Sequence, residues 1–182
     1  MPAFRPLWGL LTRRDDPAQT ASELYGRLVT QARTPALYAD LGVPDTPDGR
    51  LELVVLHVVL ALRRIGRDPQ AAELARALTE TFVTDMDDNL REMGVSDIAV
   101  ARKVKKAAAA LFDRSRDYGR ALDAADAALL AELVGNHVLP APAPAGHADA
   151  IAHYMLASEI QLAAATIADI LAGQVRFPDL TT

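Results

Sequence analysis

FVTDMDDNLREMGVSDIAVARKVKK, residues 82–106, has the pattern of one helix ending, a short glycine turn and a second helix beginning. Gly94 and Val95 supply the turn, and Ser96 is a residue type that starts helices by capping free backbone N–H groups. The charges are sorted by sign: Asp85, Asp87, Asp88, Glu92 and Asp97, with Arg91 among them, precede Arg102, Lys103, Lys105 and Lys106. The segment therefore predicts a helical hairpin with an acidic first arm and a basic second arm.

The composition favours helices throughout the chain. Of the 182 residues, 51% are hydrophobic, and alanine and leucine dominate. These residues favour helices, whereas the β-branched and aromatic residues that favour strands are few. The length is that of one domain with a substantial core. We therefore predict an all-α fold, a single compact domain of about seven to eight helices with a long final helix after a proline-rich linker.

The net charge and the cysteine content exclude several kinds of function. The net charge of −5 makes a nucleic-acid partner unexpected, because no domain-wide basic field attracts phosphate. No cysteine is present, which excludes disulfides and thiolate metal sites.

The most apolar run, residues 51–62, contains Glu52 and His57 and is shorter than the roughly 20 residues that span a bilayer. Because the N-terminus also lacks an apolar signal sequence, we expect a soluble, cytoplasmic protein.

Four helix starts share one signature, a capping residue followed by proline. They are Asp16-Pro17, Thr34-Pro35, Thr46-Pro47 and Asp68-Pro69. The cap oxygen accepts from free backbone N–H groups, and proline fits the first helical position because no N–H is needed there. Gly42, Gly66 and Gly94 are expected to end helices in left-handed geometry. The predicted helices are 17–33, 35–41, 47–65, 69–93, 97–113, 115–124, 126–137 and 147–172.

Hydrophobic periodicity assigns the buried faces. Helix 47–65 is apolar around most of its circumference, so we expect it to be central, with His57 as a hydrogen-bonded core histidine. The apolar seam of helix 69–93 comprises Ala71, Leu74, Ala75, Leu78, Phe82, Met86, Leu90 and Met93. In helix 97–113, the residues expected to face inward are Ile98, Ala101, Val104, Ala108 and Leu111.

Three segments divide the chain. We expect residues 1–15 to form a flexible or interfacial arm, residues 16–173 the helical domain, and residues 174–182 a tail. The arm residues Arg5, Trp8, Arg13 and Arg14 suit a lipid headgroup region, so peripheral attachment to the inner face of the cytoplasmic membrane is one interpretation. The other is that the arm packs on the domain through Trp8 and Leu10. Residues 137–147, HVLPAPAPAGH, predict an extended, semi-rigid linker.

The sequence contains no catalytic constellation. Asp85 and Asp88 share one helical face and suggest a magnesium-diphosphate site, but such a site needs a second acidic cluster on a facing helix. No glutamate has a histidine three residues later, as a di-metal helical bundle requires. A serine-nucleophile elbow, a phosphate loop and an HExxH motif are likewise absent. We therefore expect no enzyme activity, no metal and no cofactor. The alternative is a small-molecule-binding helical protein, or a magnesium-dependent prenyl-diphosphate enzyme that uses Asp85 and Asp88.

Two segments resemble a known family. LGVPDTPDGRLEL (41–53), followed by Leu56-His57 and Leu62-Arg63-Arg64, resembles the ubiquinol-cytochrome c chaperone family, as does DMDDNLREMGVSD (85–97) with Val104-Lys105-Lys106 behind it. The resemblance covers about 41–136 and leaves the arm and the proline linker outside. The chain departs from the pattern at Ser96, where glycine is usual, and at residues 111–114. The resemblance implies an all-helical, non-enzymatic assembly factor for the cytochrome bc1 complex that binds newly made cytochrome b.

The hairpin is the expected client surface. Sorted charges produce a local field that orients a partner, whereas a face needed only for solubility has mixed charges. Methionine adapts to irregular apolar clients. The predicted client-binding residues are Asp85, Met86, Asp88, Arg91, Glu92, Met93, Arg102, Lys105 and Lys106. Predicted partners are cytochrome b, the membrane surface and a small partner protein.

Overall fold

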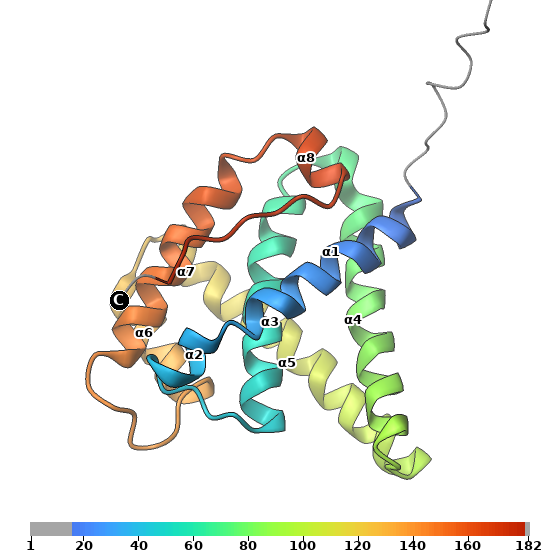
Figure 1. Cartoon of the computed structure of the whole chain (residues 1–182). Helices are drawn as coiled ribbons and strands as arrows, with labels where there is room; N and C mark the ends of the chain where they lie inside the picture. The colour runs from blue at the N-terminus through green and yellow to red at the C-terminus, as the bar shows by residue number, and fades with distance from the viewer. Residues whose placement is uncertain (1–15, 181–182) are drawn as a thin grey trace, which may run out of the picture.

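The computed structural model describes residues 16–180, and within that range it contains eight α-helices and no strand (Figure 1). The helices are α1 (Pro17–Ala32), α2 (Pro35–Ala39), α3 (Pro47–Ile65), α4 (Ala72–Glu92), α5 (Asp97–Asp123), α6 (Ala127–His137), α7 (His147–Ala163) and α8 (Ile167–Leu171), with a 3₁₀ turn, η2 (Pro69–Ala71), before α4. The predicted all-α fold is confirmed.

The proposed membrane-contact residues Arg5, Trp8, Arg13 and Arg14 lie outside the described residues. Between residues 16 and 180, no helix is both long and apolar enough to cross a bilayer.

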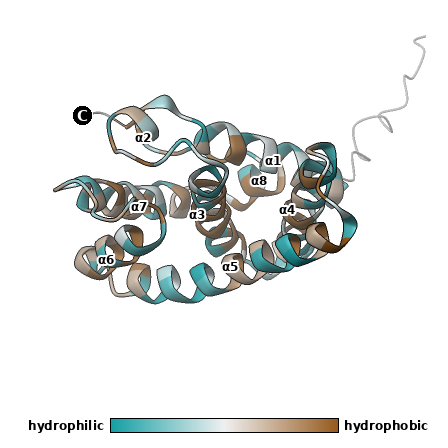
Figure 2. Ribbon diagram, turned by 90° about the horizontal axis from the view of Figure 1, so that it is seen from below, coloured by the Kyte–Doolittle hydropathy of each residue, from teal (hydrophilic) through white to brown (hydrophobic). Residues whose placement is uncertain are grey.

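Helix α3 is the centre of the domain, as predicted. Its residues 53–61 are all buried, which means that protein covers every side of the helix. In Figure 2, α1, α4, α5 and α7 surround α3. Eight of these nine side chains are Leu, Val or Ala, and each Leu or Val stabilises the fold by about 1.5–3 kcal/mol on full burial. This one helix therefore supplies the core to which the others attach.

His57 is the one polar member of this buried run, and two hydrogen bonds hold it. Its Nδ1 lies 2.7 Å from the Leu53 carbonyl oxygen, and its Nε2 lies 2.8 Å from the Tyr154 hydroxyl. The Tyr154 oxygen also accepts a hydrogen bond of 3.1 Å from the Gln31 amide, so the bonds join α1, α3 and α7. Burial lowers the pKa of His57 to about 4, which keeps the imidazole neutral at neutral pH. The prediction of a bonded core histidine is confirmed.

Three of the predicted helix caps are confirmed. The side chains of Asp16, Thr46 and Asp68 each accept a backbone N–H of the first turn, at 3.1, 3.2 and 2.9 Å. Thr34 and Ser96 occupy the N-cap position of α2 and α5, but their side chains make no capping hydrogen bond. At these two starts, the helix depends on backbone bonds and packing.

The glycine stops are confirmed at two positions and wrong at one. Gly42 and Gly94 have φ of 70° and 73°, the left-handed conformation that ends a helix. Gly66 has φ of −66°, because its N–H still bonds the Leu62 carbonyl oxygen at 2.8 Å and continues the helical path. The chain then turns through Asp68, whose cap starts η2.

Residues 97–123 form one helix, α5, and not the two helices predicted over 97–113 and 115–124. Neither proline nor glycine interrupts residues 113–115. The buried residues Ala107, Leu111, Tyr118 and Leu122 recur at helical spacing across the predicted break, so one buried stripe runs through it. Packing along this stripe keeps the helix continuous.

The helix predicted over 147–172 ends at Ala163, and the short helix α8 follows. The reason is a second start signal. The Thr166 hydroxyl accepts the Asp169 backbone N–H at 3.1 Å, and the Asp169 carboxylate accepts the Thr166 N–H at 3.2 Å. This reciprocal capping box takes the place of helix continuation. Buried Ile170 then anchors α8 to the core.

The inward face predicted for the start of α5 is wrong at two residues. Ile98 is 87% exposed and Ala101 is exposed, whereas Val100 is buried. The first turns of α5 instead turn Val100 inward, because Val100, Ala107 and Leu111 align at helical spacing. At the end of the α4 seam, Met93 is also exposed, at 65%.

The segment after α8 folds back over the helices. In Figure 1 this dark red segment runs from α8 past α1 toward α2 and α7. Val175, Phe177 and Leu180 pack against the core, and the Phe177 ring meets the His57 ring edge-on with centroids 5.0 Å apart. Residues 174–180 therefore cover the side of α3 from which the His57 ring projects.

Candidate functional site

An open groove with a volume of about 920 Å³ lies between α1, α3, α4 and α5, close to the hairpin at the lower right of Figure 1. We call it the hairpin groove. Apolar side chains from all four helices contribute to its lining, namely Val29, Leu51, Val54, Met86, Leu90 and Ala107. The volume is at the upper end of the range for ligand pockets. Because the groove is open, it suits a segment of another molecule better than an enclosed small ligand.

The charged residues of the groove are mostly basic. Among its described lining residues, five are Arg or Lys (Arg33, Arg50, Lys103, Lys106, Arg114) and three are Asp or Glu (Asp48, Glu52, Asp85). Lys103 and Lys106 form no ion pair with any residue between 16 and 180. The chain as a whole carries −5, so the groove locally reverses the sign of the protein. Such a field favours a partner that presents carboxylates.

Asp85 is turned into the groove by a tyrosine of α1. The Tyr25 hydroxyl donates to Asp85 Oδ2 at 2.8 Å, and the Tyr25 ring meets Phe82 edge-on at 6.4 Å. Burial raises the pKa of Tyr25, and the bond to Asp85 raises it further. The phenol is therefore a neutral donor, and it holds the carboxylate in one orientation.

A second polar contact crosses the groove between α3 and α5. The Arg114 guanidinium donates two hydrogen bonds to Glu52, at 3.0 and 3.1 Å. Both side chains are largely buried, with 13% and 17% of their area exposed. A two-bonded pair of this kind satisfies both charges away from water and fixes the spacing of the two helices.

The nine predicted client-binding residues divide into three sets. Asp85, Met86, Met93 and Lys106 line the hairpin groove. Asp88, Glu92, Arg102 and Lys105 are exposed and lie outside its lining. Arg91 pairs with Asp87 and with Asp97, so it links the end of α4 to the start of α5. Successive residues of an α-helix are rotated by about 100°, so the members of one continuous charged run cannot all face the same surface.

The magnesium alternative gains no support from this geometry. The Asp85 carboxylate accepts the Tyr25 hydroxyl, while Asp88 points to solvent outside the groove. Among residues 16–180, no three His, Asp or Glu side chains gather closely enough to hold a metal ion.

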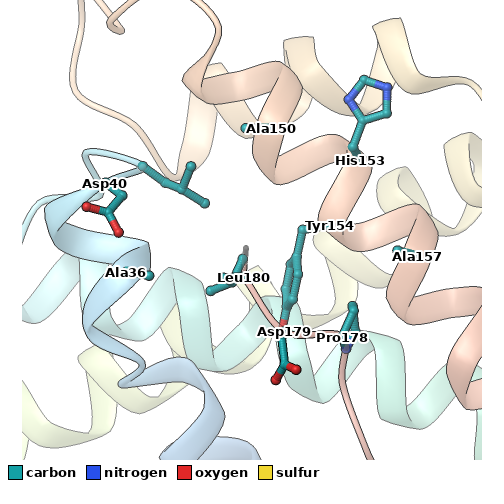
Figure 3. A pocket seen from close by; sticks show the side chains of 10 residues that line it. Ala36, Asp40, Ala150, His153, Tyr154, Ala157, Pro178, Asp179 and Leu180 are labelled. Carbon is teal, nitrogen blue, oxygen red and sulfur yellow. The ribbon is translucent and has the colours of Figure 1, made fainter. Parts of the chain in front are cut away.

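A smaller pocket of about 400 Å³ lies between α2, α7 and the C-terminal segment (Figure 3). Ala36, Leu41 and Tyr154 contribute to its apolar lining. Leu180 lies beside Tyr154, whereas the His153 ring points away from both. None of the predicted client-binding residues lines this pocket.

Comparison with known proteins decides the family. The profile of the ubiquinol-cytochrome C chaperone family matches residues 39–177. The chain belongs to this family. It is similar to the Cbp3 homolog from Brucella abortus, whose crystal structure matches with 33% identity and a TM-score of 0.82, covering 96% of this chain and 98% of that chain. No curated protein matches the chain.

The chaperone-family match is longer than the resemblance over 41–136. It continues through the proline linker, which was expected to lie outside, and through α7 and α8 to Phe177. The structure gives the reason, because Phe177 packs on His57 in the centre of the core. The family unit is therefore the whole helical assembly and includes the segment that folds back over α3.

The Leu62-Arg63-Arg64 run of this chaperone connects helices. Arg64 donates to the carbonyl oxygens of Leu162 and Ala165, at 3.1 and 2.7 Å, and so caps the end of α7. Arg63 pairs with Asp123 at 2.7 Å and with Glu159 at 3.1 Å. This part of the family resemblance therefore reflects the assembly of α3, α5 and α7.

Sequence reasoning missed two groove residues of this chaperone that come from other helices, Tyr25 on α1 and Glu52 on α3. It also passed over Lys103 and Arg114, which lie on α5 itself. One signal for Glu52 was present in the sequence. It is a carboxylate at the start of the most apolar run, and a charge buried there requires a basic partner. No local signal connects Tyr25 to Asp85, because 60 residues separate them.

Proposed function

We propose that this chain is an assembly chaperone for the cytochrome bc1 complex and that it holds newly made cytochrome b in the hairpin groove. Membership of the ubiquinol-cytochrome C chaperone family supports the general role. The observation that carries the site is the combination of an apolar lining with an excess of cations in a chain of net charge −5. Binding and release of a client need no bond chemistry, so the role requires no catalytic residue.

The groove chemistry defines the client segment. Burial against Met86, Leu90 and their apolar neighbours provides affinity, and methionine adapts to irregular apolar shapes. Lys103 and Lys106 provide selectivity for a segment whose apolar face is flanked by Asp or Glu. Cytochrome b is a membrane protein, so the proposed place of action is the cytoplasmic face of the membrane.

The test measures capture of cytochrome b made by cell-free translation in detergent micelles, so that lipid attachment plays no part. Lys103→Glu/Lys106→Glu is expected to weaken capture roughly tenfold, because two groove cations become anions. The matched control is Arg102→Glu/Lys105→Glu, which changes the charge equally on the same helix but outside the groove. It is expected to retain capture.

The opposite pattern refutes the groove. If the control loses capture and the groove variant retains it, the outer residues of α5 bind the client. If neither variant changes capture and both melt like the wild type, the charges of α5 play no part in client binding.

A further inference from the structure

The solvent side of α5 presents large apolar residues and cations together. Ile98, Arg102, Lys105, Ala109 and Phe112 follow one another at spacings of three or four residues, which places them on one side of the helix. We call them the outer face of α5. Ile98 is 87% exposed and Phe112 is 68% exposed. Among residues 16–180, two of the four exposed large hydrophobic side chains thus stand on one helix face.

Between Ile98 and Phe112 the outer face carries only positive charge, with Asp97 and Asp113 next to its two ends. The sequence contains no Asp or Glu between Ile98 and Phe112. Arg102 and Lys105 form no ion pair with any residue in the described range 16–180. In a chain of net charge −5, this is a local positive strip.

The position of α5 makes the strip accessible to an extended surface. Figure 2 shows α5 running along the lower edge of the molecule, with α1 on the opposite side. Val100, Ala107 and Leu111 turn to the core, and Ala107 lies on the opposite side of α5 from Ile98. A flat partner can therefore lie along the outer face without entering the core.

We propose that the outer face of α5 docks on a bilayer that contains anionic phospholipid. At about 1.5 Å per residue, Ile98 and Phe112 stand about 21 Å apart with both cations between them. Apolar anchors that enter the acyl boundary, beside Arg and Lys at the headgroups, are the pattern of helices lying in a membrane interface. Ile160, the exposed isoleucine of α7, has no basic residue within four positions and serves as a contrast.

The experiment is flotation of the full-length protein with two kinds of vesicle. One is an equal mixture of phosphatidylglycerol and phosphatidylcholine, and the other is phosphatidylcholine alone. Wild type is expected to float with the anionic vesicles and to be released by salt. Arg102→Gln/Lys105→Gln is expected to lower the partition coefficient roughly 30-fold. The control Arg27→Gln/Arg176→Gln removes the same charge from exposed sites on other segments and is expected to float like the wild type.

The apolar anchors are tested in parallel. Ile98→Ser/Phe112→Ser is expected to lose flotation, whereas Ile160→Ser retains it. Thermal melting confirms that each variant is folded, as expected for exposed positions.

Three results overturn the proposal. The first is unchanged flotation of Arg102→Gln/Lys105→Gln. The second is loss of flotation in Arg13→Gln/Arg14→Gln while the α5 variant still floats, because the N-terminal arm then carries the binding. The third is a wild type that does not float with anionic vesicles. If it retains a protein through Arg102 and Lys105, the surface is a protein docking site.

Discussion

Replacing His57 with glutamine tests whether the core holds a neutral histidine. In the fold, Nδ1–H donates to the Leu53 carbonyl, and Nε2 accepts from the Tyr154 hydroxyl, whose own pKa is raised to about 12 by burial and which therefore stays protonated. Glutamine can make both bonds, because its amide donates and its carbonyl accepts. The substitution therefore removes the titration while keeping the contacts.

The magnitude follows from the pKa of His57, lowered by burial from 6.5 to about 4. Below pH 6.5 the His57 side chain binds a proton in the unfolded chain, whereas in the folded chain it does so only near pH 4. Acid therefore favours unfolding. The stabilisation by neutral His57 is complete above pH 6.5 and is lost progressively as the pH falls toward 4. Between about pH 7 and about pH 5, His57 should cost the wild type about 2 kcal/mol of unfolding free energy.

The assay is urea unfolding followed by far-UV circular dichroism at both pH values. The carboxylates and the other histidines titrate alike in the two proteins, so the difference between wild type and His57→Gln isolates His57. On acidification, we expect the unfolding free energy of the wild type to fall by about 2 kcal/mol more than that of the variant. An equal loss in both proteins would show that His57 is not buried and neutral, whatever the absolute stability of the variant.

Three other substitutions or treatments test single features. Arg114→Met should lower the unfolding free energy by about 2 kcal/mol in urea titrations, because it leaves the largely buried Glu52 carboxylate unpaired. Adding Glu52→Met should recover most of this loss, and no recovery would argue against the pair. Limited proteolysis should cut first between 137 and 147, where residues 140–146 are exposed, and earlier cuts inside helices would contradict this. Thr166→Ala should cost about 1 kcal/mol in urea titrations and increase amide exchange in α8, whereas Thr166→Ser should not; equal exchange in both would show that the capping box is not what starts α8.

The hairpin groove shows which part of the site local sequence patterns could predict. Sequence pointed to the hairpin, and four of the nine residues predicted from it line the groove. The other five follow the same charge pattern but face elsewhere. Charge order along the chain does not specify the rotation of a helix about its axis, and that rotation depends on which side chains the neighbouring helices bury.

The sequence by itself determined the features that depend on residues close in the chain. Caps at Asp16 and Thr46, the turn at Gly94 and the largely apolar run 53–61 of α3 follow from hydrogen bonds and periodicity within a few residues. Local rules also predicted that His57 is buried and bonded. They failed where two local signals competed, as at Thr166, whose capping box interrupts an alanine-rich helix.

Only the tertiary structure decided which distant residues meet. Tyr25 reaches Asp85 across 60 residues, Arg114 reaches Glu52 across 62, and Tyr154 reaches His57 across 97. No periodicity records these separations, because each contact depends on how whole helices pack around α3. The same packing leaves Ile98 on the outer face of α5 and turns Lys103 into the groove. The helices are thus encoded locally, whereas the groove exists only after α1, α3, α4 and α5 have buried their apolar faces together.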